Sequence, residues 1–139
     1  MAKDIFHDSV KYALEKDGWT ITHEFYPIRD KIRDMRYDID LAAERLIAAE
    51  KGIEKIAVEV KSLLQPSLSY EFHGVLGKFL IYLHGLQFQE PDRKLYVAIP
   101  TFAWSKISHM LGLMEIIEIY RVKIIVFKPN TETIISWIE

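Results

Sequence analysis

Three segments of the chain carry apolar side chains at the spacing of an amphipathic helix. The first is residues 4–16, between Asp4 as a cap or first-turn acid and Gly18 as a stop signal. The second, residues 67–88, has a wide apolar stripe with a period of 3.6 residues, and the third is residues 102–118. The pattern therefore predicts three helices.

Between and after these segments the pattern is that of β-strands. Residues 19–25 alternate apolar and polar side chains, whereas residues 95–99 are continuously apolar, as in a central strand covered on both faces. Residues 37–62 indicate two antiparallel strands that turn near residues 50–53, and residues 123–127 and 133–138 indicate a terminal hairpin.

Residues 41–50 are the ambiguous part of this pattern, because their alanine, leucine and glutamate content favours a helix. We interpret them as strand, since the segments on both sides are strongly strand-like. The order of elements is then αβββαβα followed by two short strands. It predicts an α/β sandwich of one central mixed sheet flanked by helices, in a single domain over residues 1–139.

Composition narrows the class of protein. The chain has 139 residues, 50% of them hydrophobic and 27% charged, and no cysteine, which excludes disulfides and zinc–thiolate sites. Its apolar runs are too short to cross a bilayer, and residues 1–6 show no signal sequence, so we expect a cytoplasmic protein without a membrane partner. The net charge of −2 gives no overall basic excess for nucleic-acid binding.

The candidate chemistry lies in the two-stranded ribbon. Asp40 belongs to its first strand, and Glu59 and Lys61 point the same way from its second strand. Two carboxylates can hold Mg²⁺ or Mn²⁺, and a lysine can position water and stabilise charge on a phosphate. This D…ExK arrangement is that of the PD-(D/E)XK nucleases. Asp38 is the reserve ligand, and the alternative for all these residues is an ordinary cross-strand charge network.

Just before Asp40 the chain carries a block of mixed charge, residues 29–36, which we interpret as a basic loop. Its cationic side chains are expected to contact DNA phosphates without reading sequence. They are Arg29, Lys31, Arg33 and Arg36. The alternative is a solvated surface loop with no ligand.

Seven segments spread along nearly the whole chain share the pattern of one known family. They are residues 4–8 (DIFHD), 16–23 (KDGWTITH), 39–44 (IDLAAE), 46–52 (LIAAEKG), 55–62 (KIAVEVKS), 124–127 (IIVF) and 137–138 (WI). Through them the sequence resembles the XisH family, the fdxN element excision controlling factors of cyanobacteria. The resemblance implies a restriction-endonuclease-like fold and a role in programmed DNA excision, assisting a site-specific recombinase together with a companion of the XisI type.

Three further site residues follow from this resemblance. His7 lies where related nucleases carry a glutamate that supports the metal, although a histidine satisfied by a neighbouring acid is an equal alternative. Lys78 stands where the family pattern has glutamine, and it either contacts the scissile phosphate or faces solvent. Tyr82, one turn further, either presents its hydroxyl to the phosphate or anchors the helix to the sheet.

The prediction is thus a DNA-processing protein that acts as a Mg²⁺- or Mn²⁺-dependent endonuclease, with Asp40, Glu59, Lys61, His7, Lys78 and Tyr82 at the site. The main alternative is an inactive accessory factor that binds a recombinase, a XisI-type companion or DNA. A toxin-like nuclease held by a partner is a third alternative. Nucleases of this fold often act as dimers, so a homodimer is a further expectation.

Overall fold

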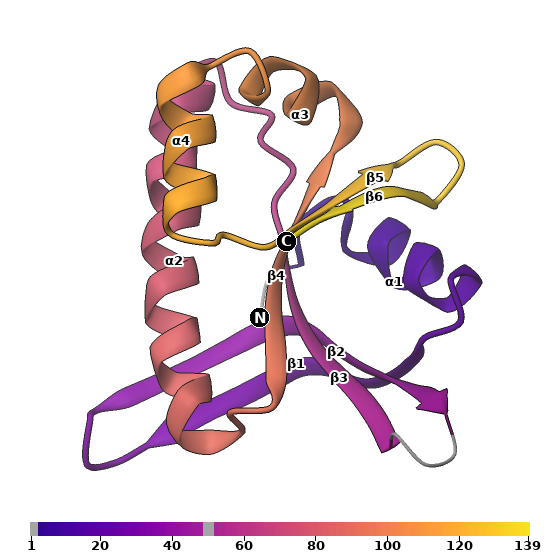
Figure 1. Ribbon diagram of the computed structural model, residues 1–139, viewed down its shortest axis with the longest axis vertical. Coiled ribbons are helices and arrows are strands. Elements are labelled where there is room, and N and C mark those ends of the chain that lie inside the picture. Colours follow the sequence, from indigo (N-terminus) through magenta and orange to yellow (C-terminus); the bar gives the residue numbers. More distant parts are fainter. Residues whose placement is uncertain (1–2, 49–51) are drawn as a thin grey trace.

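The structure is a computed structural model that describes residues 3–48 and 52–139 (Figure 1). The elements follow the predicted order of one α/β domain, except that two helices stand where the third predicted helix was expected. They are α1 (His7–Lys16), β1 (Thr20–Asp30), β2 (Met35–Ala48), β3 (Gly52–Val60), α2 (Leu68–Gln89), β4 (Arg93–Pro100), α3 (Thr101–Ile107), α4 (Leu111–Ile119), β5 (Ile124–Lys128) and β6 (Thr133–Ile138).

The strands form one six-stranded sheet in the order β1-β2-β3-β4-β5-β6. The pairs β3–β4 and β4–β5 are parallel, and the other three pairs are antiparallel. Each parallel pair is joined by a helical crossover, through α2 in one case and through α3 and α4 in the other, as parallel strands require. The predicted α/β class with a mixed sheet is confirmed.

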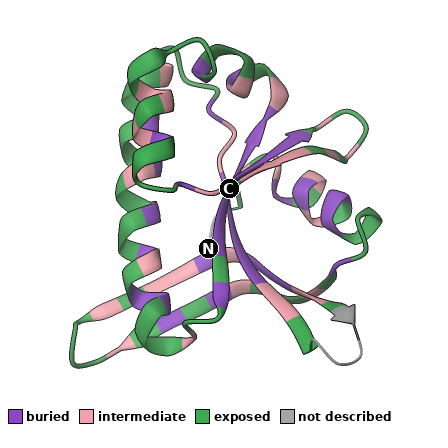
Figure 2. Cartoon of the chain, viewed as in Figure 1, coloured by how far each residue is buried: buried purple, intermediate pink, exposed green. Residues whose placement is uncertain are grey.

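Helices cover both faces of this sheet. Figure 1 shows α2 and α4 on one side and α1 on the other. The buried side chains accordingly form two clusters, and β4 contributes to both of them: Val97 packs towards α2, and Tyr96 packs towards α1. This explains the unbroken apolar run of residues 95–99, and Figure 2 shows β4 buried along most of its length.

The ambiguous segment of the second predicted strand is β-structure. Residues 41–48 belong to β2. Residues 41–44 pair with β1 on one side and with β3 on the other, and the rest of the segment pairs with β3. The first half of the predicted turn at residues 50–53 lies outside the described residues. At its end, Gly52 has φ +79°, a backbone conformation that glycine adopts readily. Pairing on both edges outweighs the helical propensity of the alanines and leucines.

Two predictions about elements are wrong. Residues 29–36 are not a loop, because β1 continues to Asp30 and β2 begins at Met35. Pro27 does not end β1, since β1 is an edge strand that can accommodate a residue without an N–H group. Residues 102–118 are not one helix. Polar side chains end α3, where the Ser108 hydroxyl and His109 Nδ1 both bond the carbonyl oxygen of Ser105.

The described helices offer no membrane span: none of them is both long enough and apolar enough to cross a bilayer.

Candidate metal and phosphate site

The site begins where the sheet divides. The β2–β3 ladder ends at the pair Leu41 and Val58, while β3 continues beside β4 to Val60. The preceding part of β2, residues 35–39, pairs only with β1. Asp40 lies at this fork, and its Oδ2 accepts the backbone N–H of Val60 at 2.7 Å. The carboxylate thereby replaces a missing ladder partner and is fixed beside the end of β3.

Glu59 lies next to the fork and faces α2. Its neighbours Val58 and Val60 belong to the cluster on the α1 side, so strand alternation directs Glu59 to the opposite face. The side chain is 7% exposed, and Oε2 is 3.8 Å from Lys61 Nζ and 3.4 Å from Lys78 Nζ. The other oxygen, Oε1, is buried and has no hydrogen-bond partner.

The surroundings of Glu59 shift its ionisation. Burial, followed by repulsion from the Asp40 carboxylate, raises the pKa of Glu59 to about 7, against the opposing attraction of Lys78 and Lys61. Burial, followed by the neighbouring Lys78 ammonium, lowers the pKa of Lys61. Strong perturbation of an acid and a base in one cleft is typical of functional sites.

Lys78 and Tyr82 reach this site from α2, one helical turn apart. The Lys78 side chain is 46% exposed, so its ammonium group contacts both solvent and the buried carboxylate of Glu59. Tyr82 is buried, and its ring lies 5.6 Å from that of Tyr37. Burial, followed by the charge of Glu59, raises the pKa of Tyr82 to about 12. Tyr82 therefore anchors α2 to the sheet while its hydroxyl stays protonated beside the acids.

A shallow groove of about 410 Å³ opens beside the two lysines. It runs between the chain that follows β3 and the first turns of α2. Its lining consists of Lys61, Leu63, Tyr70, Glu71, His73, Gly74, Val75 and Lys78. The structure thus brings together Asp40, Glu59, Lys61, Lys78 and Tyr82 and places them next to an accessible groove.

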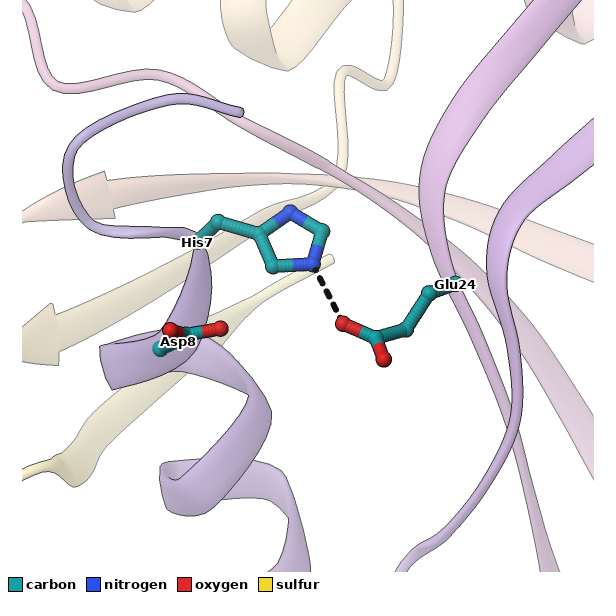
Figure 3. Close-up of side chains that lie close together, drawn as sticks. All are labelled: His7, Asp8 and Glu24. Carbon is teal, nitrogen blue, oxygen red and sulfur yellow. Dashed lines mark hydrogen bonds and ion pairs between the residues drawn. The ribbon is translucent and has the colours of Figure 1, made fainter. Parts of the chain in front are cut away.

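His7 has other partners. It is buried on α1, and its Nε2 lies 3.0 Å from Glu24 Oε1 (Figure 3). Its ring stacks on Phe25. Asp8 completes a group whose potential ligand atoms lie within 4.8 Å of one another. The bond to Glu24 fits one of the two alternatives that the sequence left open, whereas the other ring nitrogen, Nδ1, is buried and has no hydrogen-bond partner among the described residues.

Sequence reasoning missed Glu24. Its position depends on an irregularity of β1, where the pairing register shifts between Ile21 and His23 and Phe25 has φ +63°. No residue pattern in this part of the sequence reveals such a bulge, although Glu24 stands in a strand that was expected.

The remaining predicted residues lie on the β1–β2 hairpin. Asp38, the reserve metal ligand, forms an ion pair with Arg29 at 3.0 Å, so its carboxylate already has a partner on the hairpin. Arg33 pairs with Asp30 at 2.8 Å. Arg36 stands opposite Arg29 in the ladder, and both are exposed, as is Lys31 at the tip. Arg29 and Arg33 are thus partly neutralised, and all four cations are spread along the hairpin.

The donor atoms at the fork suit a hard divalent cation. Asp40 and Glu59 provide carboxylate oxygens from adjacent strands, and Glu59 Oε1 lacks any protein partner. Magnesium sites commonly use only one or two carboxylates and complete the coordination with water and substrate phosphate. The two nearby ammonium groups oppose a cation, and both side chains line the groove.

Comparison with known proteins agrees with this architecture. Residues 1–135 match the family described as XisH protein. An XisH family protein from Nostoc punctiforme PCC 73102 is 39% identical, with a TM-score of 0.86 over 98% of this chain and 100% of that one. An fdxN element excision controlling factor protein from Anabaena variabilis is 40% identical, with a TM-score of 0.87 over 99% and 100%. No curated protein matches the chain. The chain therefore belongs to the XisH family.

Proposed function

We propose that this protein is a restriction-endonuclease-like domain of the PD-(D/E)XK type that cleaves DNA with the help of Mg²⁺ or Mn²⁺. The observation that carries the proposal is the buried Glu59 carboxylate, whose Oε1 has no partner although Asp40, Lys61 and Lys78 surround it. A carboxylate in this state is suited to an additional positive ligand, because its own neighbours do not saturate it.

Asp40 and Glu59 are the residues that would hold the ion. When bound, a divalent cation supplies Lewis acidity to a phosphoryl oxygen and stabilises the charge of the transition state. The bond from Val60 N–H to Asp40 fixes one carboxylate, and the burial of Glu59 restricts the other, so both are oriented in advance.

The two lysines have different roles. Lys61 Nζ lies 3.8 Å from Glu59 Oε2, where the side chain would position the attacking water and stabilise the negative charge of the transition state. Lys78 is more exposed and lies at the mouth of the groove, where its ammonium can bind the non-bridging oxygens of the scissile phosphate. Tyr82 positions α2, and with it Lys78, against the sheet.

The exposed cations of the β1–β2 hairpin, above all Lys31 and Arg36, would hold flanking phosphates. The name of the Anabaena relative, an excision controlling factor, favours DNA excision as the setting. We include a site-specific recombinase and a XisI-type companion as partners in this proposal, and a cytoplasmic location, where DNA is accessible.

A second candidate is an accessory factor that binds DNA or a recombinase without cutting. The position of Lys78, 3.4 Å from Glu59, favours it. Together Lys61 and Lys78 can balance the charges of Asp40 and Glu59, so the acids have some compensation without a metal.

Cleavage and metal binding measured on the same variants separate these candidates. With Mn²⁺ and plasmid, branched or single-stranded DNA, Lys61→Ala is expected to lose cleavage while metal binding, followed by calorimetry, is retained. Asp40→Ala is expected to lose both, because it removes an oxygen ligand. Lys106→Ala, on the exposed part of α3, is the control.

Cleavage that persists in both variants would identify a contaminating nuclease. Metal binding without cleavage by the unmodified protein on all three substrates would select the accessory factor.

A further inference from the structure

The outward face of α2 is apolar although the protein itself does not cover it. Only Glu71 and Lys78 are charged among the 22 residues of this helix. A helix that is apolar on all sides is normally buried on all sides. Tyr70 is nevertheless 74% exposed and Ile81 is 41% exposed. Phe88 is 52% exposed, although the Arg33 guanidinium stacks 3.4 Å from the centre of its ring. Figure 2 shows α2 largely exposed along the edge of the molecule.

These side chains belong to one regular seam on the face opposite the core. Its residues follow one another at alternating steps of four and three, the spacing at which helices pack side by side in coiled coils. They are Tyr70, Gly74, Gly77, Ile81, His84 and Phe88. Each of them is exposed, and none is an acid, a lysine or an arginine.

The seam is complementary to itself when one copy is reversed. Pairing residues that lie equally far before and after position 79 places Gly77 against Ile81. The same rule places Gly74 against His84 and Tyr70 against Phe88. Small residues thus meet large ones and an aromatic ring meets an aromatic ring. We infer that a second copy of this chain packs its α2 antiparallel against this seam, in a homodimer with two-fold symmetry.

The glycines support the close approach of a partner helix. A Cβ atom on Gly74 or Gly77 would meet nothing within 4 Å, so no contact inside the chain requires glycine there. Gly85 differs, because its Cβ would lie 2.7 Å from Ile28 Cγ2. Glycine weakens a helix interior relative to alanine, and in the dimer Gly74 and Gly77 leave room for His84 and Ile81 of the other copy.

The apolar area of this face is a large part of what a dimer interface needs. The exposed parts of Tyr70, Ile81 and Phe88, together with Leu80, which is 57% exposed beside them, amount to on the order of 500 Å² per chain. The two histidines of this face add to it. Stable interfaces bury about 800 Å² per partner.

The symmetry also has a consequence for the groove. A two-fold axis between antiparallel helices keeps the same flank of both helices on the same side. Lys78 lies on one flank of the seam and Leu80 on the other. Both copies of Lys78 would therefore lie on one face of the dimer, and the partner helix would form part of each groove, because Tyr70 and Gly74 belong to both the seam and the groove lining.

Light scattering coupled to gel filtration tests the interface. We expect the unmodified chain to have twice its monomer mass of 16.3 kDa, and Ile81→Glu to elute as a monomer with an unchanged circular dichroism spectrum. Ile119→Glu is the matched control, since Ile119 is 70% exposed on α4 and lies outside the seam. A monomeric unmodified chain would overturn the inference, as would a dimer that survives Ile81→Glu.

Disulfide cross-linking tests the register, and the absence of native cysteine makes it unambiguous. The double variant Gly74→Cys/His84→Cys should form a covalent dimer on oxidation. Either single variant should not, because antiparallel copies of one position would be separated by ten residues, about 15 Å along the helix. Efficient cross-linking of Gly74→Cys alone would indicate a parallel arrangement and refute the proposed pairing.

Discussion

Replacing Glu59 by glutamine should stabilise the metal-free protein at alkaline pH. Glutamine keeps the shape of the side chain and removes its charge. The pKa of Glu59 is raised in the folded protein from 4.5 to about 7, so the folded state binds this proton more tightly than the unfolded state does. Ionisation of the Glu59 carboxyl group therefore destabilises the folded state, chiefly because the side chain is buried.

The sign and size follow from linkage. Between about pH 4.5 and pH 7 the folded state holds more protons at this site, so its contribution to the free energy of unfolding falls as pH rises through this window. A shift of this size corresponds to about 3 kcal/mol. We therefore expect Glu59→Gln and the unmodified protein to be similar at pH 4.5, and the variant to be more stable by up to about 3 kcal/mol at pH 8.

Urea unfolding followed by tryptophan fluorescence measures this difference. The experiment compares both proteins at several pH values in the presence of EDTA, with Glu115→Gln on the exposed surface of α4 as control. Adding Mg²⁺ at pH 8 should reverse the order, because the ion stabilises only a folded state that can bind it. Equal stability of the two proteins at pH 8 would refute the assignment of Glu59 as a destabilising, incompletely compensated acid.

Two further predictions concern the cations. Lys78→Gln should tighten Mg²⁺ binding at pH 8 roughly tenfold in calorimetry, because it removes a positive charge 3.4 Å from Glu59. Lys106→Gln is the control, and unchanged or weaker binding by Lys78→Gln would count against a metal at Glu59. Lys31→Ala should weaken DNA binding equally for unrelated sequences and lower the salt dependence by about one counterion. Lys128→Ala, an exposed lysine on β5, should do neither, and equal effects of the two changes would refute a phosphate contact at the hairpin tip.

The sheet and the central acids could be predicted because local pattern determines them. Strand alternation places Glu59 and Lys61 on one face, and a ribbon that turns near residue 50 brings Asp40 beside them. The structure has this pairing, with Leu41 opposite Val58 immediately before the fork. The fork itself was not predictable, since it depends on where β2 stops pairing with β3, and no residue type marks that point.

Other features depend on tertiary contacts that carry little local signal. Pro27 normally marks the end of a strand, and only the edge position of β1 allows the strand to continue through it. The break between α3 and α4 interrupts an apolar pattern that continues into Leu111 and Ile119, although both of these side chains are exposed. The contact of His7 with Glu24 joins residues that are 17 positions apart.

The two acids at the fork also bear on the choice between cutting and binding alone. A groove that only held phosphate would bind it more strongly without Asp40 and Glu59, because their negative charges repel the phosphate. The two carboxylates also attract the ammonium groups of Lys61 and Lys78, which weakens the attraction of these lysines for phosphate. Burying Glu59 also lowers the stability of the folded protein at neutral to alkaline pH. Both costs are offset when a cation joins the carboxylates, since the acids then bind the cation and the lysines remain available for phosphate. The charge arrangement therefore favours a ternary site for metal and phosphate over a site for phosphate alone.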